Sequence, residues 1–340
     1  MKKLERKQLW LLVIGVVAVV VVFATLLLAL GGAGAERAGE TREEDAFLSR
    51  EKGYFRILVA GVDRASGLSD VLMLVSLNWD TGEAWVLQIP RDTYAVYTEG
   101  SYRKLNGAPN ALGGMEQMKQ FLSEALGLSI DRTVRLSPDA FCRVVDTLGG
   151  VEIELERAMH YEDPAQGLSI HLPKGKQTLD GQAAEQFVRY RAGYAQGDLG
   201  RMDAQKVFLA ALFRKVSGIT SPVTLAQLGM AMLEELETDL TVADATMLAG
   251  EVLSLKAENV FLVTAPGEAA TAKSGASYYA LSRQGMAELL AAHFGGTAEG
   301  FDPERVFLNP NNERFGEIYD GYTVYEPFCV SGLSGGESGE

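Results

Sequence analysis

The sequence has few cysteines and histidines, the residues that most often hold transition metals. Its two cysteines, Cys142 and Cys329, lie far apart and outside any CxxC spacing, so neither a disulfide framework nor a zinc site is predicted, and unpaired thiols are expected. The three histidines are scattered. No HExxH, GxSxG or GK[ST] P-loop motif occurs. Catalysis by a serine or cysteine nucleophile therefore has no support.

Positive charge is also scarce. The 340 residues include 31 Lys and Arg against 45 Asp and Glu, for a net charge of -14. A phosphate backbone is held by surplus Lys and Arg, so no nucleic-acid partner is expected and any phosphate binding must be local. With 47% hydrophobic and 22% charged residues, the chain is neither disordered nor fibrous and can bury a core.

Residues 9–30 form an uncharged apolar run of about 22 residues, the length of a bilayer-spanning helix. Basic residues precede it, whereas the residues after it are of mixed charge. The positive-inside rule then predicts a single-pass protein of the cell membrane, with residues 1–8 in the cytoplasm and the C-terminal domain extracellular. A cleaved signal peptide ending near residues 33–35 (AGA) is an alternative, but the run is longer than a signal peptide needs. A buried core helix is the third interpretation.

Beyond this helix the pattern predicts a linker over 31–53, a folded domain over 54–296, and an extension over 297–340 that ends in a flexible tail. Short β-rich runs alternate with helical periodicity. The alternation predicts an α/β fold, a single α-β-α layered domain with a central mixed sheet, preceded by the transmembrane helix. Strands are expected at 54–63, 71–79, 83–92, 151–155 and 259–266. Helices are expected at 113–126, 138–148, 180–187, 201–216 (strongly amphipathic), 225–237, 243–255 and 282–294.

Charged residues at the ends of the first strands form two candidate clusters. Asp63-Arg64 follows the first strand and Asp70 precedes the second, so two carboxylates flank one loop, as a Mg²⁺ ion that bridges phosphate oxygens requires. Turn and capping roles explain these residues equally well. Arg91 follows the third strand, and Arg103-Lys104 lies downstream on an expected polar loop. A planar guanidinium suits bidentate phosphate binding, although an Arg-Asp surface pair is the simpler alternative.

A third cluster combines Arg189-Tyr190-Arg191 with residues 197–201 (GDLGR) and Gln205. If the RYR stretch is extended, both arginines point to one face, and the two glycines allow a close approach before a helix N-terminus. That end of a helix attracts anions. A solvated basic patch is the alternative, but so many arginines near Gly-rich turns are unusual in an acidic protein.

Seven short motifs occur in order: GVDR, SDV, IPRDT, KLN with a following GG, FCRVVDTLGGVEIEL, LDGQAAEQFVRYR and GDLGRMDAQ. Together they resemble the LytR-CpsA-Psr family of membrane-anchored cell-wall enzymes, over residues 54–296. The resemblance implies an α-β-α core in which a polyprenyl tail lies between sheet and helices, with the pyrophosphate at the mouth. It also implies transfer of a glycopolymer, such as a teichoic acid or capsule chain, from its lipid carrier to peptidoglycan.

The resemblance further implies roles for single residues. Asp63 and Asp70 would hold Mg²⁺, and Arg91 would be catalytic. The remaining pyrophosphate-binding set would be Arg64, Arg103, Lys104, Arg189, Arg191, Asp198, Arg201 and Gln205. Two positions depart from the family pattern: Val71 stands where Thr is usual, and Ala204 where Arg is common.

The expected reaction is a phosphotransfer in which a peptidoglycan hydroxyl attacks the glycan-proximal phosphorus and lipid monophosphate leaves. The expected partners are thus the polyprenyl-pyrophosphate-linked glycan, the peptidoglycan acceptor and membrane lipid. Asp92 and Asp198 are candidates for the general base by proximity in sequence alone. Two alternatives stay open: hydrolysis of the lipid pyrophosphate, and a non-catalytic protein that binds wall polymer or lipid carrier.

Overall fold

The structure is a computed structural model. It describes residues 53–62, 67–98, 101–163, 168–190, 194, 198–219, 236–241, 244, 248, 255–296, 305–308, 313, 315, 325 and 327–333. The predicted cytoplasmic segment, the predicted membrane span 9–30 and all of the linker except Gly53 lie outside this part of the chain. None of the helices in the described part is long and apolar enough to cross a membrane.

A seven-stranded sheet forms the centre of the domain, in the order β11-β6-β1-β2-β3-β12-β15. Its strands β1, β2 and β3 are antiparallel neighbours, whereas β6 runs parallel to β1 and β12 parallel to β3. The sheet is therefore mixed, as predicted. The bounds are β1 Tyr54–Val62, β2 Ser69–Asn78, β3 Glu83–Gln88, β6 Arg132–Leu136, β11 Leu236–Thr238, β12 Val260–Thr264 and β15 Phe328–Cys329.

The first three strands are mostly apolar and are buried along almost their whole length, as expected for a sheet that is covered on both faces. The predicted turn between β2 and β3 is confirmed: the amide of Gly82 donates to the carbonyl of Asn78 at 2.9 Å, and Gly82 has φ 66°. That φ favours glycine at the end of the turn.

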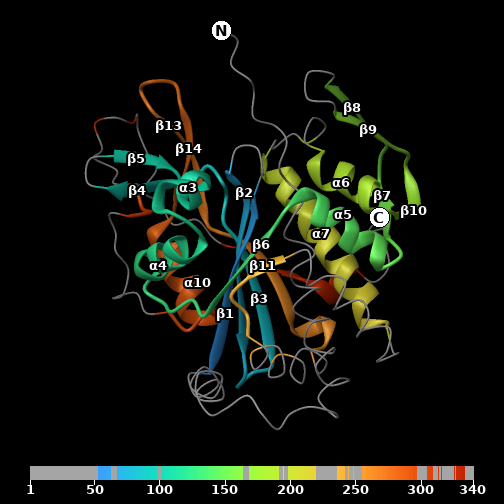
Figure 1. The fold of residues 1–340 in the computed structure, drawn as a ribbon, viewed down its shortest axis with the longest axis horizontal. Helices are drawn as coiled ribbons and strands as arrows, with labels where there is room; N and C mark the ends of the chain where they lie inside the picture. Colours follow the sequence, from blue (N-terminus) through green and yellow to red (C-terminus); the bar gives the residue numbers. More distant parts are fainter. Residues whose placement is uncertain are drawn as a thin grey trace, which may run out of the picture.

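Helices cover the sheet in two layers, which confirms the α-β-α arrangement. On one face, the core includes side chains of α5 (Pro138–Thr147), α6 (Gly181–Arg189) and α7 (Asp198–Ser217). On the other, it includes side chains of α4 (Met115–Leu126) and α10 (Arg283–His293). Figure 1 shows these groups on opposite sides of the sheet. Ser137, Asp180 and Ser282 cap the N-termini of α5, α6 and α10 with side-chain hydrogen bonds.

Within the described residues, four two-stranded ribbons lie outside the central sheet. Two of them, β4–β5 and β13–β14, lie together beside α3 (Ala108–Leu112), and β7–β10 and β8–β9 lie on the side of α6 (Figure 1). Their bounds are β4 Tyr94–Thr98, β5 Ser101–Lys104, β7 Val151–Leu155, β8 Met159–Asp163, β9 Leu168–Leu172, β10 Gly175–Leu179, β13 Gly267–Thr271 and β14 Ser277–Leu281. Short 3-10 turns occur at Leu105–Gly107, Ala257–Asn259 and Val330–Leu333.

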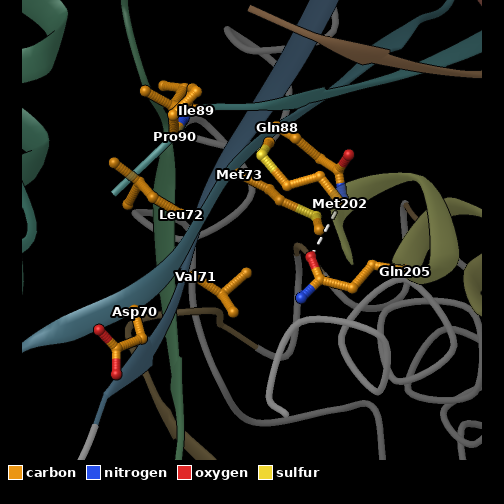
Figure 2. A pocket seen from close by; sticks show the side chains of 9 residues that line it. All are labelled: Asp70, Val71, Leu72, Met73, Gln88, Ile89, Pro90, Met202 and Gln205. Carbon is orange, nitrogen blue, oxygen red and sulfur yellow. Dashed lines mark hydrogen bonds between the residues drawn. The ribbon is translucent and has the colours of Figure 1, made fainter. Parts of the chain in front are cut away.

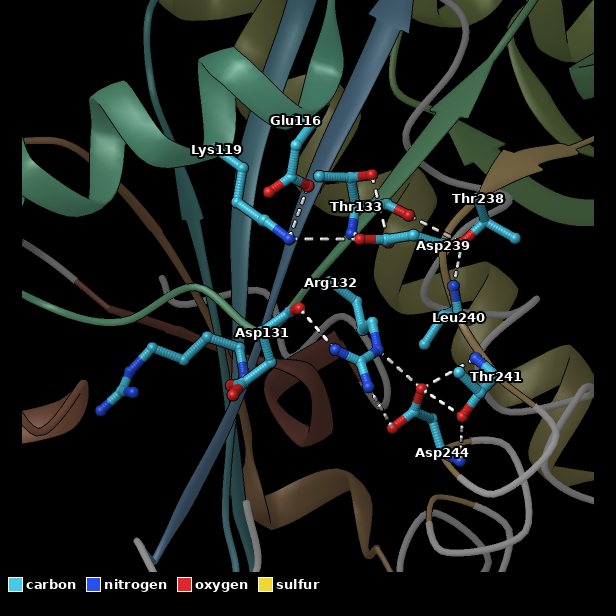
Figure 3. A network of polar contacts seen from close by, with 11 residues as sticks. Glu116, Lys119, Asp131, Arg132, Thr133, Thr238, Asp239, Leu240, Thr241 and Asp244 are labelled. Atoms are coloured by element: carbon cyan, nitrogen blue, oxygen red, sulfur yellow. Dashed lines mark hydrogen bonds and ion pairs between the residues drawn. The ribbon is translucent and has the colours of Figure 1, made fainter. Parts of the chain in front are cut away.

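A polar network fixes the β11 edge of the sheet (Figure 3). Arg132 of β6 donates from Nε and Nη2 to the two carboxylate oxygens of Asp244, at 2.7 and 3.2 Å. Asp244 is fully buried and also accepts from the amide and hydroxyl of Thr241. Nearby, Asp239 accepts from the amide of Thr133 and pairs with Lys119 of α4 at 3.3 Å. Ion pairs and hydrogen bonds thus hold the chain around the short strand β11 against β6 and α4.

Several predictions about local structure are wrong. The helix predicted at 201–216 exists within α7, but it is not amphipathic: residues 208–213 are all buried, because α7 packs between the sheet and its neighbours. Leu236 and Glu237, predicted as helical, belong to strand β11, which pairs with β6. Of the helix predicted at 243–255, Asp244 and Leu248 are helical and Leu255 is not. The residues 225–235 lie outside the described part.

The sheet continues past the predicted boundary at residue 296. Strand β15 pairs antiparallel with β12, and Val306, Phe307 and Phe315 are buried in the hydrophobic clusters. Apolar residues of the extension therefore contribute to the core. Cys142 and Cys329 are both unpaired, as expected.

Candidate functional site

The segment after β3 is a tight loop that holds Arg91. Its carbonyl groups are occupied: Thr93 donates to Pro90 from its amide and its hydroxyl, Asn106 donates to the carbonyl of Arg91, and Tyr279 donates to that of Asp92. These bonds tie the loop to the 3-10 turn Leu105–Gly107 and to β14. The backbone that carries Arg91 is thus held on several sides.

A chain of ion pairs runs from β2 through this loop to β5. Arg91 Nη1 donates to Asp70 Oδ1 at 3.0 Å, and the two side chains are only 12% and 8% exposed. Arg91 Nε lies 3.7 Å from Asp92 Oδ1, which also accepts from Lys104 Nζ at 3.0 Å. The chain joins three of the predicted site residues, together with Asp92. In contrast to the prediction of a polar loop, Arg103 and Lys104 lie in strand β5.

Tyr278 of β14 lies next to this chain. The Nζ of Lys104 is 5.7 Å from the centroid of the Tyr278 ring. Burial raises the pKa of Tyr278, and Tyr102 and Asp92 raise it further, while the exposed Arg103 opposes them. Arg103 lies in β5 between Tyr102 and Lys104.

The third predicted cluster forms where α6 meets α7. Gln205 Nε2 donates to the carbonyl of Val188 at 3.5 Å, and Arg201, 2% exposed, lies one helical turn before Gln205 on α7. Arg189 is the last residue of α6 and not part of an extended stretch. The prediction that Arg189 and Arg191 share one face of a strand therefore fails on the Arg189 side, because the helix capped by Asp180 runs through this position.

The guanidinium of Arg189 is only partly satisfied. Its Nη1 donates to Glu185 Oε1 at 2.8 Å, one turn earlier on α6, and its side chain is 10% exposed. Its Nε and Nη2 are buried, and neither has a hydrogen-bond partner within the described part of the chain. These two atoms form the edge with which an arginine binds a phosphate or carboxylate bidentately. Arg189 therefore presents a buried donor edge that needs an acceptor.

A small cavity of about 10 Å³ lies between β2, β3 and α7. It is lined by Asp70, Val71, Leu72, Met73, Gln88, Ile89, Pro90, Met202 and Gln205. In Figure 2, Asp70 lies apart from Gln88, Met202 and Gln205, and its carboxylate points away from them. Because Asp70, Met202 and Gln205 are all lining residues, the cavity extends from Asp70, the partner of Arg91, to the first turns of α7. Its volume is that of about one water, far less than a polyprenyl chain needs.

The structure thus brings predicted residues from separate stretches to one region. Asp70, Arg91 and Lys104 are linked by ion pairs, and Asp70 and Gln205 border one cavity. The side chains of four predicted residues are not described: Asp63, Arg64 and Arg191 lie outside the described residues, and of Asp198 only the helical backbone is described.

Among the described residues no three His, Cys, Asp or Glu side chains are grouped to hold a metal ion. Of the predicted pair of magnesium ligands, Asp70 is described. Mg²⁺ is usually bound by one or two carboxylates together with waters and substrate phosphates. A single buried carboxylate, such as that of Asp70 beside Arg91, fits that donor set.

Two residues of this region were missed by the sequence reasoning. Gln88 is 1% exposed, lines the cavity and donates a hydrogen bond to Gln205. The signal for it was present, because the apolar run AWVL of β3 ends in a glutamine, and that position is buried. Glu185 pairs with Arg189 through the i,i+4 spacing of a helix, which follows from the sequence once α6 is known to reach Arg189.

Comparison with known proteins agrees with this architecture. The chain is 30% identical over 201 residues to the polyisoprenyl-teichoic acid--peptidoglycan teichoic acid transferase TagU of Oceanobacillus iheyensis; the match covers 57% of this chain and 61%, less than two thirds, of that protein. The crystal structure of B. subtilis TagV matches with a TM-score of 0.62 at 23% identity, over 71% of this chain and 96% of that one, and shows the shared fold.

A structure of TagT bound to LI-WTA matches with a TM-score of 0.57 at 27% identity, over 76% of this chain and 93% of that one. The profile of the LytR_cpsA_psr family matches residues 29–294, well over half of the chain. The protein therefore belongs to the LytR-CpsA-Psr family.

Proposed function

We propose that this protein is a membrane-anchored, extracellular phosphotransferase that attaches a polyprenyl-pyrophosphate-linked glycopolymer to peptidoglycan. The relatives support this proposal: TagU is named for transfer of teichoic acid to peptidoglycan, and TagT is described bound to LI-WTA. The polymer belongs to the teichoic acid or capsule class. The anchor is the apolar run at residues 9–30, with the N-terminus in the cytoplasm.

The observation that carries the proposal is the open edge of Arg189. Its Nε and Nη2 are buried, and no acceptor in the described part of the chain reaches them. A buried cationic donor that lacks an acceptor is costly, so a ligand with paired anionic oxygens would stabilise it. A pyrophosphate supplies such oxygens. Gln205, which binds the carbonyl of the neighbouring Val188, connects this edge to the cavity beside Asp70.

Arg91 is the proposed catalytic residue. Asp70 and the hydrogen-bonded loop hold its guanidinium in place before any substrate arrives. A fixed cation stabilises the charge that develops on phosphate oxygens in the transition state without reorganisation, and one such group is worth about 10²–10³-fold in kcat. Positioning and charge neutralisation account for most of the catalysis in phosphoryl transfer. An enzyme of this kind therefore needs no covalent nucleophile.

Asp63 and Asp70 are the proposed ligands of Mg²⁺, which when bound would neutralise charge on the phosphate oxygens. The other phosphate-binding residues are Arg64, Arg103, Lys104, Arg191, Asp198, Arg201 and Gln205. Lys104 and Arg91 both pair with Asp92. This carboxylate therefore partly neutralises both cations before a substrate phosphate binds. The polyprenyl tail would have to separate α7 from the sheet, since the cavity there holds about one water.

Product analysis tests the proposal. The full-length chain in lipid nanodiscs is incubated with lipid-linked glycan, Mg²⁺ and peptidoglycan oligomers, and polymer linked to peptidoglycan is expected. Free phosphorylated glycan would instead indicate a hydrolase, and unchanged substrate with a raised melting temperature would indicate a binding protein. Arg189→Ala is expected to lower product formation at least tenfold. Arg214→Ala, at the exposed far end of α7, is the matched control and is expected to retain activity.

A further inference from the structure

Two glutamines meet in the apolar layer between the sheet and α7. Gln88 of β3 is 1% exposed and Gln205 of α7 is 2% exposed, and Gln88 Nε2 lies 3.5 Å from Gln205 Oε1. Val71, Met73 and Met202 line the same space. Amide groups are rarely buried among such side chains unless their hydrogen bonds are made. The partners of these amides therefore indicate what the space contains.

The orientation of both amides follows from one carbonyl group. The oxygen of Val188 can only accept, so the group that Gln205 directs toward it must be its amide nitrogen, Nε2. Gln205 Oε1 then faces Gln88 and accepts from Gln88 Nε2. The remaining polar atom of Gln88 is its oxygen, Oε1, which is buried and has no hydrogen-bond partner within the described part of the chain.

The cavity borders both glutamines, as Figure 2 shows. Its volume of about 10 Å³ is at the lower limit for one water molecule. A buried acceptor on a residue that lines a space of this size needs a donor, and an ionised phosphate or carboxylate oxygen cannot supply one. The Asp70 carboxylate is directed away from the pair in the same view. The ligand class is thus a small group with an O–H or N–H.

We propose that this cavity is a binding site for a single hydrogen-bond donor that donates to Gln88 Oε1, and that water occupies it in the protein alone. Gln88 lies three residues before the catalytic candidate Arg91, and Gln205 lies one helical turn after Arg201. The proposed site differs in chemistry from the adjacent arginines: a guanidinium binds hydrogen-bond acceptors, whereas Gln88 Oε1 binds a hydrogen-bond donor. The proposal concerns the protein without substrate and does not depend on the transfer reaction.

Crystal structures of the full chain, at a resolution that defines ordered water, test the proposal. In the wild type we expect one water 2.7–3.2 Å from Gln88 Oε1. Gln88→Met keeps the side-chain length and removes the acceptor, so the water should disappear. The control Gln117→Met alters an exposed glutamine of α4 and should retain the water. The wild-type structure alone would overturn the proposal if the cavity were empty or if a protein donor were paired with Gln88 Oε1.

A second arm identifies the source of the donor. Crystals soaked with a polyprenyl-pyrophosphate-linked sugar would show either the same water or a sugar hydroxyl or amide N–H at Gln88 Oε1, and both are donors of the proposed class. A phosphate oxygen at this position would contradict the proposal. Failure of the transfer assay, in contrast, would leave the water site unaffected, so the two ideas fail separately.

Discussion

The pair formed by Asp70 and Arg91 permits a prediction that separates folding from catalysis. Arg91→Met removes the guanidinium that neutralises a carboxylate only 8% exposed. Breaking a buried pair from one side costs about 3–5 kcal/mol, and the partial exposure of both side chains favours the lower end, about 3 kcal/mol. For a domain of this size, 1 kcal/mol shifts Tm by about 2–4 °C. The expected drop in Tm is thus about 6–12 °C.

The companion variant removes the charge from the other side. Asp70→Asn combined with Arg91→Met leaves no buried charge at the pair, so we expect the double variant to recover most of the lost Tm. Its turnover should stay at least about 10²-fold below wild type, since the stabilising cation is still missing. Thermal unfolding and the transfer assay are run on the wild type, Arg91→Met and the double variant.

Either of two results would refute this reasoning. If the double variant melts at the temperature of Arg91→Met, the two side chains are not energetically coupled and the pair has no structural role. If Arg91→Met turns over within a factor of about three of wild type, Arg91 does not stabilise the transition state, because a group in that role contributes far more.

Three further predictions concern the scaffold. Arg132→Met leaves the fully buried Asp244 without its bidentate ion pair, so urea unfolding should show a loss of about 3 kcal/mol, and a loss under 1 kcal/mol would contradict the burial argument. His293 has a pKa lowered by burial, so the unfolded state binds more protons below pH ~6.5. Its contribution to stability should be present above that pH and be lost as the pH falls, and His293→Gln should flatten this part of the pH profile. Gly149 and Gly150 both have positive φ, but a Cβ at Gly150 would lie 2.8 Å from a backbone oxygen whereas one at Gly149 meets nothing within 4 Å. Gly150→Ala should therefore destabilise the fold by about 1–3 kcal/mol more than Gly149→Ala, and equal effects would be inconsistent with this packing.

The parts of the fold that follow from the sequence are those with strong local patterns. Strands β1–β3 are continuous apolar runs with a turn signal between β2 and β3, and α5 and α10 begin at side-chain caps that the sequence displays. Motif order also indicated that Asp70, Arg91 and Gln205 belong to one region, and the structure places two of them around one cavity and joins the third to it by an ion pair.

The remaining features depend on contacts distant in sequence. Leu236 and Glu237 look helical, but they form a strand because β6 offers an open edge. Residues 201–216 were predicted to form an amphipathic helix, yet within α7 the six consecutive residues 208–213 are all buried by neighbouring elements. The carbonyl of Val188 orients the amide of Gln205, and Gln205 in turn orients the amide of Gln88. This leaves Gln88 Oε1 without a partner among the described residues. Local propensity carries no information about such partners.

The most direct test of the account is a crystal structure of the full chain with polyprenyl pyrophosphate and Mg²⁺. We expect the pyrophosphate oxygens to contact Arg91 and the Nε–Nη2 edge of Arg189, with the metal ion on Asp70. A pyrophosphate bound elsewhere on the surface, with the Arg189 edge still lacking an acceptor, would contradict the proposed site.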